Sequence, residues 1–581
     1  MSTRARVGIT LALVCVAVSC AGPGEDERAT PETGPYKLGQ TIYYGGDIIT
    51  MAGDEPQYAE AVVQREGGIV FVGDKDEALE RFKGKADEVD LEGRTMLPGF
   101  IDAHGHLKNV GFQALAADLL PPPDSDVDSI AVLQKKLKEW GEGELSQKFG
   151  WVVGFGYDDS QLAEQRHPTR DDLDEVSRDR PVFIIHQSGH LYVANSKLLE
   201  LAGVTAETED PPGGVIRRRT GSREPDGVLE ETGLMPILEV FPEIGDGGAR
   251  REVEEGIALY TEFGFTTANE GRAFPQDLDV FTSMAEAGEL AIDVVVYPDY
   301  WLGREKLEGN PWLSRSYRNH FRIGGVKGNL DGSPQGKTAW LSQPYFKPPD
   351  GRDADYAGYP MLEDDNAVAM FDEAYAKGWQ IINHVNGDAA IDQMIRAARA
   401  ATEKYGPADR RTVGIHSQTI RADQLDAYKE LGIIPSFFGM HTFYWGDWHR
   451  DSVLGPERAA FISPAKAALD RGMIYTQHHD APVALPNSIA ILATQVNRTT
   501  RSGKVLGPDQ RVSAWDALRS ITVNAAYQYF EEDRKGTIEE GKLADFVILD
   551  RNPLEVEPET LFDLRVLETI KEGETVYSYS R

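Results

Sequence analysis

Short apolar runs recur along the central part of the chain, bounded by Gly and polar residues, and helical patterns lie between several of them. Runs of this kind are typical of buried parallel strands. The helical patterns include NAVAMFDEAYAKG and ADQLDAYKELG. The eight runs are TMLPGFIDAHGH, FGFTTANE, AIDVVVYP, FRIGGVKGNLDG, WQIINHVNGD, RTVGIHSQ, GIIPSFFG and GMIYTQHHDAPV. Their number and spacing predict an α/β fold, a (β/α)8 TIM-type barrel over residues 98–530.

Both ends of the chain show another pattern, in which short alternating strands are separated by Gly and Asp turns. Residues 37–97 and 531–581 predict the two halves of one small β-sandwich, with the barrel inserted between them. Two unrelated β extensions are the alternative. The interval after the first barrel strand, about residues 111–249, is too long for one loop and predicts an inserted subdomain over the barrel mouth.

Residues 1–20 have the pattern of a secretory signal, because Arg4 and Arg6 precede an apolar run too short to span a bilayer. VSC followed by AG resembles a bacterial lipoprotein cleavage site with Cys20 as the lipidated residue. Ala17 stands where Leu is usual, so ordinary signal cleavage is the alternative. Residues 21–36 predict a flexible tether. We expect export from a bacterial cytoplasm, either to a membrane lipid anchor or to the periplasm or medium.

Composition narrows the classes of function. The chain has 581 residues, 41% hydrophobic and 27% charged, which suffices for a large core. Its formal net charge of −34 disfavours nucleic-acid binding, which needs a basic face. The two cysteines, Cys15 and Cys20, lie in or beside the signal, so no disulfide, thiolate ligand or cysteine nucleophile exists downstream. Composition leaves the oligomeric state open, a homo-oligomer included.

Side chains that bind metals stand where the predicted strands end. His104 and His106 in FIDAHGHLKN are one residue apart, so on a strand they point to the same side. The ends of the fourth, fifth, sixth and eighth strands carry Lys327, His384, His416 and Asp480. Barrel enzymes place their chemistry at the carboxyl ends of strands, and His and carboxylate donors without thiolate suit Zn²⁺, Mn²⁺ or Fe²⁺. A single buried histidine is more often structural, but the ordered set predicts a metal site.

This ordered set resembles the amidohydrolase superfamily of metal-dependent hydrolases. The similarity is to the amidohydrolase family 3 branch, which includes N-substituted formamide deformylases, and it covers nearly all of the chain after the signal. The similar segments are PGFIDAHGH, WVVGFGYDDSQ, PVFIIHQSGHLYVANSKLLELAG and GTIEEGKLADFVILDRNP. The resemblance implies two divalent ions, with Zn²⁺ expected. It assigns one ion to His104, His106 and Asp480, the second to His384 and His416, and the bridge to a carboxylated Lys327.

Lys327 needs chemical conversion for that role, because an ammonium ion repels cations. Addition of CO2 to the neutral amine gives a carbamate, an anion with two oxygens, and burial beside metals lowers the lysine pKa enough to permit it. Asp331, four residues later, supports an alternative in which Lys327 forms an ion pair and the site holds one metal.

Three further residues are candidates for substrate contacts. His190 lies in the inserted HQSGHLYVANSK, a motif shared with the family, while the nearby His186 is as readily structural. His441 and Trp445 lie in the aromatic run GMHTFYWGDWHRD. This run predicts either a pocket wall for an apolar group or a separate packing cluster under a long loop.

The residues before Asp480 are unusual for the family, since QHHDAPV carries two histidines there. His478 and His479 are candidates for extra ligands, substrate contacts or residues that orient a ligand. Alternation on a strand favours His478 on the side of Asp480, where it would contact the substrate or orient a ligand.

These residues predict hydrolysis of an amide-like C–N bond in a small molecule, an N-acyl, N-formyl or cyclic amide. Divalent metals lower the pKa of bound water, hydroxide attacks the carbonyl, and Asp480 is placed to move the proton to the departing nitrogen. The chain contains no GxSxG motif, which disfavours serine chemistry. A lactonase, esterase or deaminase with the same site is one alternative. A non-catalytic ligand-binding surface lipoprotein is the alternative from another class.

Overall fold

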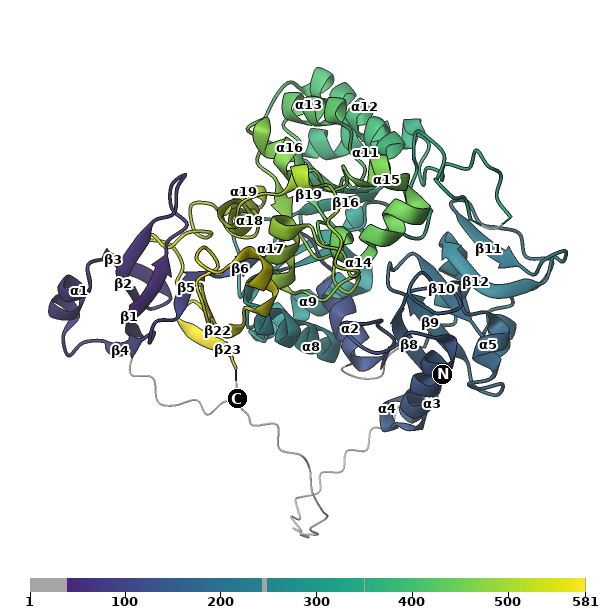
Figure 1. Ribbon diagram of the computed structural model, residues 1–581, viewed down its shortest axis with the longest axis horizontal. Coiled ribbons are helices and arrows are strands. Elements are labelled where there is room, and N and C mark those ends of the chain that lie inside the picture. Colours follow the sequence, from purple (N-terminus) through teal and green to yellow (C-terminus); the bar gives the residue numbers. More distant parts are fainter. Residues whose placement is uncertain (1–38, 243–247, 350, 580–581) are drawn as a thin grey trace, which may run out of the picture. The chain divides into compact units, whose positions relative to one another are not determined.

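The computed structural model describes residues 39–242, 248–349 and 351–579. Strands and helices alternate over most of this range, which confirms the predicted α/β class (Figure 1). The predicted signal, Cys20 and the tether lie outside the described residues. Among the described helices, none has the length and apolar character needed to cross a bilayer.

Parallel strands make up the central region, and each of the eight predicted runs contains one of them, with two in the fourth run. They are β6 (Phe100–Ile101), β13 (Phe265–Ala273), β14 (Asp293–Pro298), β15 (Phe321–Ile323), β16 (Gly325–Asn329), β17 (Gln380–Val385), β18 (Val413–His416), β19 (Ile434–Phe437) and β20 (Thr476–Gln477). One sheet has the order β15-β14-β13-β6 and another the order β16-β17-β18-β19-β20. All pairings in both sheets are parallel.

The two parallel sheets are connected at both sides. Only Gly324 separates β15 from β16, so the fourth run takes part in both sheets. Beyond the first and last strands, the Asp480 N–H donates to the His104 carbonyl at 3.2 Å and the His106 N–H donates to the Ala481 carbonyl at 2.8 Å. The spatial order of the strands therefore follows the chain, and the residues after its first and last strands lie together.

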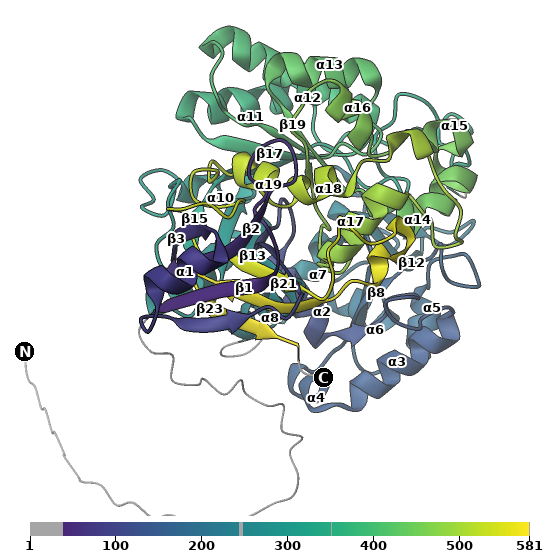
Figure 2. The same cartoon turned by 60° about the vertical axis from the view of Figure 1, so that its left-hand side comes forward.

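Helices between the strands bury one apolar face. Both helical patterns predicted from the sequence are confirmed, as α11 (Asp364–Lys377) and α13 (Ala422–Leu431). Gly378 caps the carboxyl end of α11, and its φ of 70° is a conformation that glycine adopts without steric cost. Figure 2 shows α11, α12 (Asp388–Tyr405) and α13 next to one another beside the strands. The buried residues of α11 recur at helical spacing and are Ala367, Met370, Phe371, Ala374 and Tyr375.

Strands from both chain ends join in one eight-stranded sheet. β1 (Gln40–Ile49) and β5 (Thr95–Pro98) come from the amino-terminal part, and β21 (Phe546–Leu549) comes from the carboxy-terminal part, drawn in yellow in Figure 1. β5 and β21 pair antiparallel. This pairing satisfies backbone groups that a free edge would leave open. Side chains of both halves, among them Val62, Ile69, Phe546 and Ile570, also share one buried core. The sandwich arrangement of the two halves stays a prediction.

A six-stranded sheet forms from the chain between β6 and β13, in the order β11-β12-β10-β9-β8-β7. Its strands are β7 (Ala117–Asp118), β8 (Val152–Tyr157), β9 (Val182–His186), β10 (Leu191–Ala194), β11 (Gly214–Arg218) and β12 (Pro225–Glu231). Leu133 and Leu137 of α3 (Ile130–Glu142) pack with its apolar residues in a separate core. The sheet lies within the predicted insertion, and α8 (Gly248–Glu262) leads back to β13.

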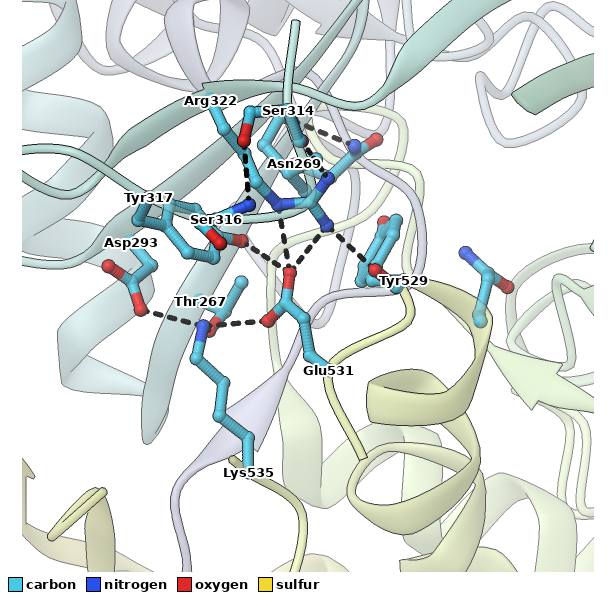
Figure 3. A network of polar contacts seen from close by, with 12 residues as sticks. Thr267, Asn269, Asp293, Ser314, Ser316, Tyr317, Arg322, Tyr529, Glu531 and Lys535 are labelled. Atoms are coloured by element: carbon cyan, nitrogen blue, oxygen red, sulfur yellow. Dashed lines mark hydrogen bonds and ion pairs between the residues drawn. The ribbon is translucent and has the colours of Figure 1, made fainter. Parts of the chain in front are cut away.

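A buried network of ion pairs connects the segment after α19 (Val523–Gln528) to the parallel strands (Figure 3). Lys535 Nζ lies 2.6 Å from a carboxylate oxygen of Asp293 and 2.8 Å from one of Glu531. Arg322 Nε donates to Glu531 at 3.1 Å. Asp293 is the first residue of β14, so this network lies at the amino-terminal ends of the strands and leaves their carboxyl ends free for other chemistry.

Candidate functional site

Histidine and aspartate side chains converge beyond the carboxyl ends of the parallel strands. His104, His416 and Asp480 offer ligand atoms that all lie within 4.8 Å of one another. Nε2 of His104 and Nε2 of His106 are each 3.4 Å from Oδ1 of Asp480. His384 Nδ1 lies 3.0 Å from His416 Nε2. The structure thus brings together the strand-end residues that the sequence selects.

Lys327 lies in β16 among these histidines, with Nζ 3.0 Å from Nε2 of His104. Burial lowers the pKa of the Lys327 amine to about 7, so a neutral amine is present near neutral pH. The alternative Lys327–Asp331 ion pair is wrong, because no such contact occurs in the described parts of the chain. The Asp331 carboxylate instead accepts the N–H groups of Trp340, Asn386 and Gly387.

Burial keeps three of the converging imidazoles neutral. Burial lowers the pKa of His104, His384 and His416 well below the usual range for histidine. His384 Nε2 lies 3.1 Å from the Gly332 carbonyl and 3.0 Å from the side-chain amide nitrogen of Asn386. In the tautomer that donates from Nε2 to the Gly332 carbonyl, the lone pair on Nδ1 of His384 faces Nε2 of His416, the arrangement that two ligands of one ion need.

The backbone is strained at two of these positions. His416 has φ 70° and Asp480 has φ 54°, the left-handed region that non-glycine residues rarely adopt. Such conformations cost of order 1–3 kcal/mol each and persist where the surrounding structure holds them. The hydrogen bond from the Asp480 N–H to the His104 carbonyl is one such constraint.

Two polar residues within β13 orient the first histidine pair, and the sequence analysis missed them. Asn269 Oδ1 lies 3.2 Å from Nδ1 of His104, and Glu270 Oε1 lies 3.6 Å from Nδ1 of His106. Both contacts leave Nε2 of each ring directed at Asp480. The signal was present, because ANE ends the second run as HGH ends the first.

His478 and His479, the two unusual histidines, take different places. His478 is fully buried, with Nε2 3.0 Å from Nδ1 of His416 and Nδ1 3.0 Å from Ser436 Oγ. Both of its nitrogens are thus engaged, so the geometry favours the orienting role over a substrate contact. Nδ1 of His479 accepts the Ala481 N–H, and its ring packs away from the other site histidines.

The aromatic run after β19 packs inward and contacts the insertion. Trp445 of α14 (His441–Trp448) is fully buried, and its indole N–H donates to Asp158, which follows β8. His441 is buried too, with Nδ1 2.9 Å from Nε2 of His449. These contacts favour the packing-cluster interpretation over the predicted pocket wall. Phe438, which the sequence analysis did not select, lies nearer to the site, with its ring 5.3 Å from that of His478.

Two histidines of the insertion, His186 and His190, also lie in different surroundings. His186 lies 3.1 Å from Oδ1 of Asp159 and stays within the insertion, which favours a structural role. His190 reaches the site, with its ring centre 5.0 Å from that of His384.

Four imidazoles, a buried lysine amine and a carboxylate that converge at the ends of parallel strands define a metal-dependent hydrolase. The sequence profile of the Amidohydrolase family matches residues 87–577 of the chain. The chain belongs to this family, and the resemblance stated from the sequence is confirmed.

Known proteins agree with this assignment over almost the whole chain. The N-substituted formamide deformylase of Arthrobacter pascens is 27% identical over 540 residues, covering 90% of this chain and 95% of the relative. The protein YtcJ of Bacillus subtilis is 26% identical over 565 residues, covering 93% of this chain and 100% of the relative. The crystal structure of an uncharacterized metal-dependent hydrolase from Pyrococcus horikoshii has a TM-score of 0.71 at 26% identity, covering 89% of this chain and 99% of that one.

Proposed function

We propose that the chain hydrolyses an amide-like carbon–nitrogen bond of a small molecule, an N-acyl, N-formyl or cyclic amide. The observation that carries the proposal is the convergence of four imidazoles and the Asp480 carboxylate around Lys327. The relative from Arthrobacter pascens, named for N-substituted formamides, supports the choice of an amide over an ester.

We infer that the parallel strands close into a (β/α)8 barrel with the site at its carboxyl ends. Their sequential order and the hydrogen bonds between the residues after β6 and after β20 support this closure. In this arrangement the six-stranded sheet is the inserted subdomain, and the eight-stranded sheet forms the small domain built from both chain ends.

The residues present fit divalent cations. Oδ1 of Asp480 is buried and has no hydrogen-bond partner among the described residues. Burial lowers the pKa of His106, but the carboxylates of Asp480 and Glu270 outweigh burial and raise this pKa to about 9. Positive charge is therefore favoured between these groups. A bound cation would take the place of that proton, because metal binding to a histidine displaces its proton.

Two ions fit the donor set, with Zn²⁺ expected and Mn²⁺ or Fe²⁺ as alternatives, because the donors are nitrogen and oxygen atoms. When bound, the ions supply Lewis acidity at the substrate carbonyl and lower the pKa of water. One ion would be held by His104, His106 and Asp480, the other by His384 and His416, with a carboxylated Lys327 between them.

Asp480 is placed to move protons during the reaction. Its carboxylate lies between the two histidine pairs, 3.4 Å from Nε2 of His106 and 3.9 Å from Nε2 of His416. From this position it can accept a proton from the attacking water and deliver it to the departing nitrogen, acting first as a base and then as an acid.

Replacing Asn269 by alanine should weaken divalent metal binding by roughly 10- to 100-fold, because His104 loses the partner that fixes its ring. Competition with a chelator measures the affinity. Asn383→Ala is the matched control. This side chain is also fully buried, and its amide has no hydrogen-bond partner among the described residues. Equal affinities for wild type and Asn269→Ala would contradict the orienting role.

The proposed function is tested with matched N-formyl, N-acyl and cyclic amides, together with esters and lactones of the same groups. We expect turnover of amides, loss of turnover with a chelator, and about two divalent ions per chain by elemental analysis. Turnover of esters or lactones alone would favour the esterase or lactonase alternative. Deamination without acyl release would favour a deaminase. Ligand binding without turnover of any compound would favour the non-catalytic lipoprotein.

A further inference from the structure

His190 and a glutamate form a hydrogen-bonded pair at the ends of two neighbouring strands of the insertion. His190 directly precedes β10 and Glu231 is the last residue of β12, and these strands are antiparallel neighbours. The Glu231 N–H donates to the His190 carbonyl at 2.9 Å. Nδ1 of His190 lies 2.8 Å from Oε2 of Glu231. The pair is therefore joined through both backbone and side chains.

Glu231 is held firmly in this orientation. Its other carboxylate oxygen accepts the Thr338 hydroxyl at 2.8 Å, so both oxygens are engaged. The side chain is 4% exposed. The backbone of Glu231 has φ 49°, which is unfavourable for a residue with a side chain. Thr338 comes from the segment after β16, so the carboxylate connects the insertion to the region that carries Lys327.

The orientation of Glu231 fixes the proton of His190. An ionised carboxylate can only accept hydrogen bonds, so Nδ1 of His190 carries a proton, and in the neutral imidazole Nε2 then keeps its lone pair. No described residue makes a hydrogen bond to this Nε2, and the side chain is 15% exposed. The ring centre lies 5.0 Å from that of His384. A hydrogen-bond acceptor thus stands beside the candidate metal ligands, open to a bound molecule.

We propose that Nε2 of His190 accepts a hydrogen bond from the N–H of the scissile amide, with Glu231 as its positioning residue. The inference rests on the proposed function and names its substrate class more closely, as amides that carry an N–H. An ester or lactone has an oxygen in place of that N–H and cannot donate a hydrogen bond to Nε2 of His190. A site built around a hydrogen bond discriminates against the analogue that lacks the donor. His190 is therefore a specificity-determining residue for amides over esters.

The experiment compares an N–H amide with the ester of the same acyl and leaving groups in Glu231→Gln, His190→Asn and the double variant. In Glu231→Gln the new amide can donate to Nδ1, which moves the proton to Nε2 and converts the acceptor into a donor. We expect kcat/KM for the amide to fall at least about tenfold in each single variant, and the value for the ester to change less than about threefold. The double variant should be no slower than His190→Asn alone, because Glu231 acts through His190.

Glu230→Gln is the matched control, because Glu230 is the neighbouring buried glutamate of β12 and pairs with Arg217. It should leave the ratio of amide to ester turnover unchanged. An equal loss on amide and ester in Glu231→Gln, or additive losses in the double variant, would show that Glu231 is merely structural and overturn the proposal. A wild type that prefers the ester would overturn it as well.

A second measurement needs no turnover. Diethyl pyrocarbonate modifies an unprotonated imidazole nitrogen, and peptide mass spectrometry gives its rate at His190. We expect modification in wild type and Glu230→Gln, and slowing by at least about threefold in Glu231→Gln as the lone pair leaves Nε2. An unchanged rate in Glu231→Gln would overturn the pairing. If the modification rates are as expected but no amide is turned over, the pairing of His190 with Glu231 stands and the proposed function is overturned. The scissile amide N–H would then no longer be the hydrogen-bond donor to His190.

Discussion

Replacing Asp480 by asparagine should lower kcat by about 10² to 10⁴, the usual contribution of a general acid or base. The amide is nearly isosteric with the carboxylate and keeps a weak oxygen ligand, but it cannot accept the proton of water. The fold and the metal content should stay close to wild type. The acidic limb of the kcat/KM pH profile should flatten or move. Steady-state kinetics across pH, with elemental analysis of the same samples, measures both effects.

Near wild-type turnover in Asp480→Asn with its metals in place would mean that the proton passes through another group. Among its neighbours, His478 is engaged at both nitrogens by His416 and Ser436, and His479 accepts a backbone N–H. His190, whose Nε2 has no hydrogen-bond partner among the described residues, would then be examined next.

Replacing Lys327 by alanine should abolish measurable turnover, and short carboxylic acids added with metal should restore part of it. A free carboxylate can supply the two oxygens of the carbamate, whereas an amine would add only a cation beside cations. Assays of the variant with acetate or propionate, and with amines of similar size as the control, separate these cases. Rescue by amines alone would show that Lys327 acts as a cation.

The proposed carbamate on Lys327 also predicts a pH dependence with a definite sign. Burial lowers the pKa of this amine to about 7, so its neutral fraction rises as the pH passes upward through 7. The neutral amine is the form that adds CO2. Reactivation of metal-free protein at constant dissolved CO2 should therefore increase from pH 6 to pH 8. A decrease over this range would contradict the proposed carbamate.

Much of the candidate site could be predicted because its signals are local. His104, His106, Lys327, His384 and Asp480 each follow or interrupt an apolar run, and in a parallel α/β fold the ends of such runs meet at one side. The order of the runs also predicted the order of the parallel strands. These features depend on residues within a few positions of one another, so the sequence carries them directly.

The partners of these side chains could not be predicted in this way. Asp331 stands four residues after Lys327, yet the two side chains do not pair. The Asp331 carboxylate accepts the backbone N–H groups of Asn386 and Gly387, which follow β17, and that of Trp340, which lies later in the loop after β16. Asn269 and Glu270 orient histidines about 165 residues away, because β13 pairs with β6. Trp445 belongs to an aromatic run that suggested a pocket wall, but the direction of its helix places the ring against the insertion.

The sequence by itself determined the family, the α/β class and the residues that stand at the strand ends, because periodicity and short motifs express these properties locally. Only the tertiary structure decided that β5 pairs with β21 and that Glu231 holds His190 beside His384. Such contacts join residues far apart in the chain. They depend on which edges and faces the folded backbone brings together, and no local pattern of hydrophobic and polar positions encodes that choice.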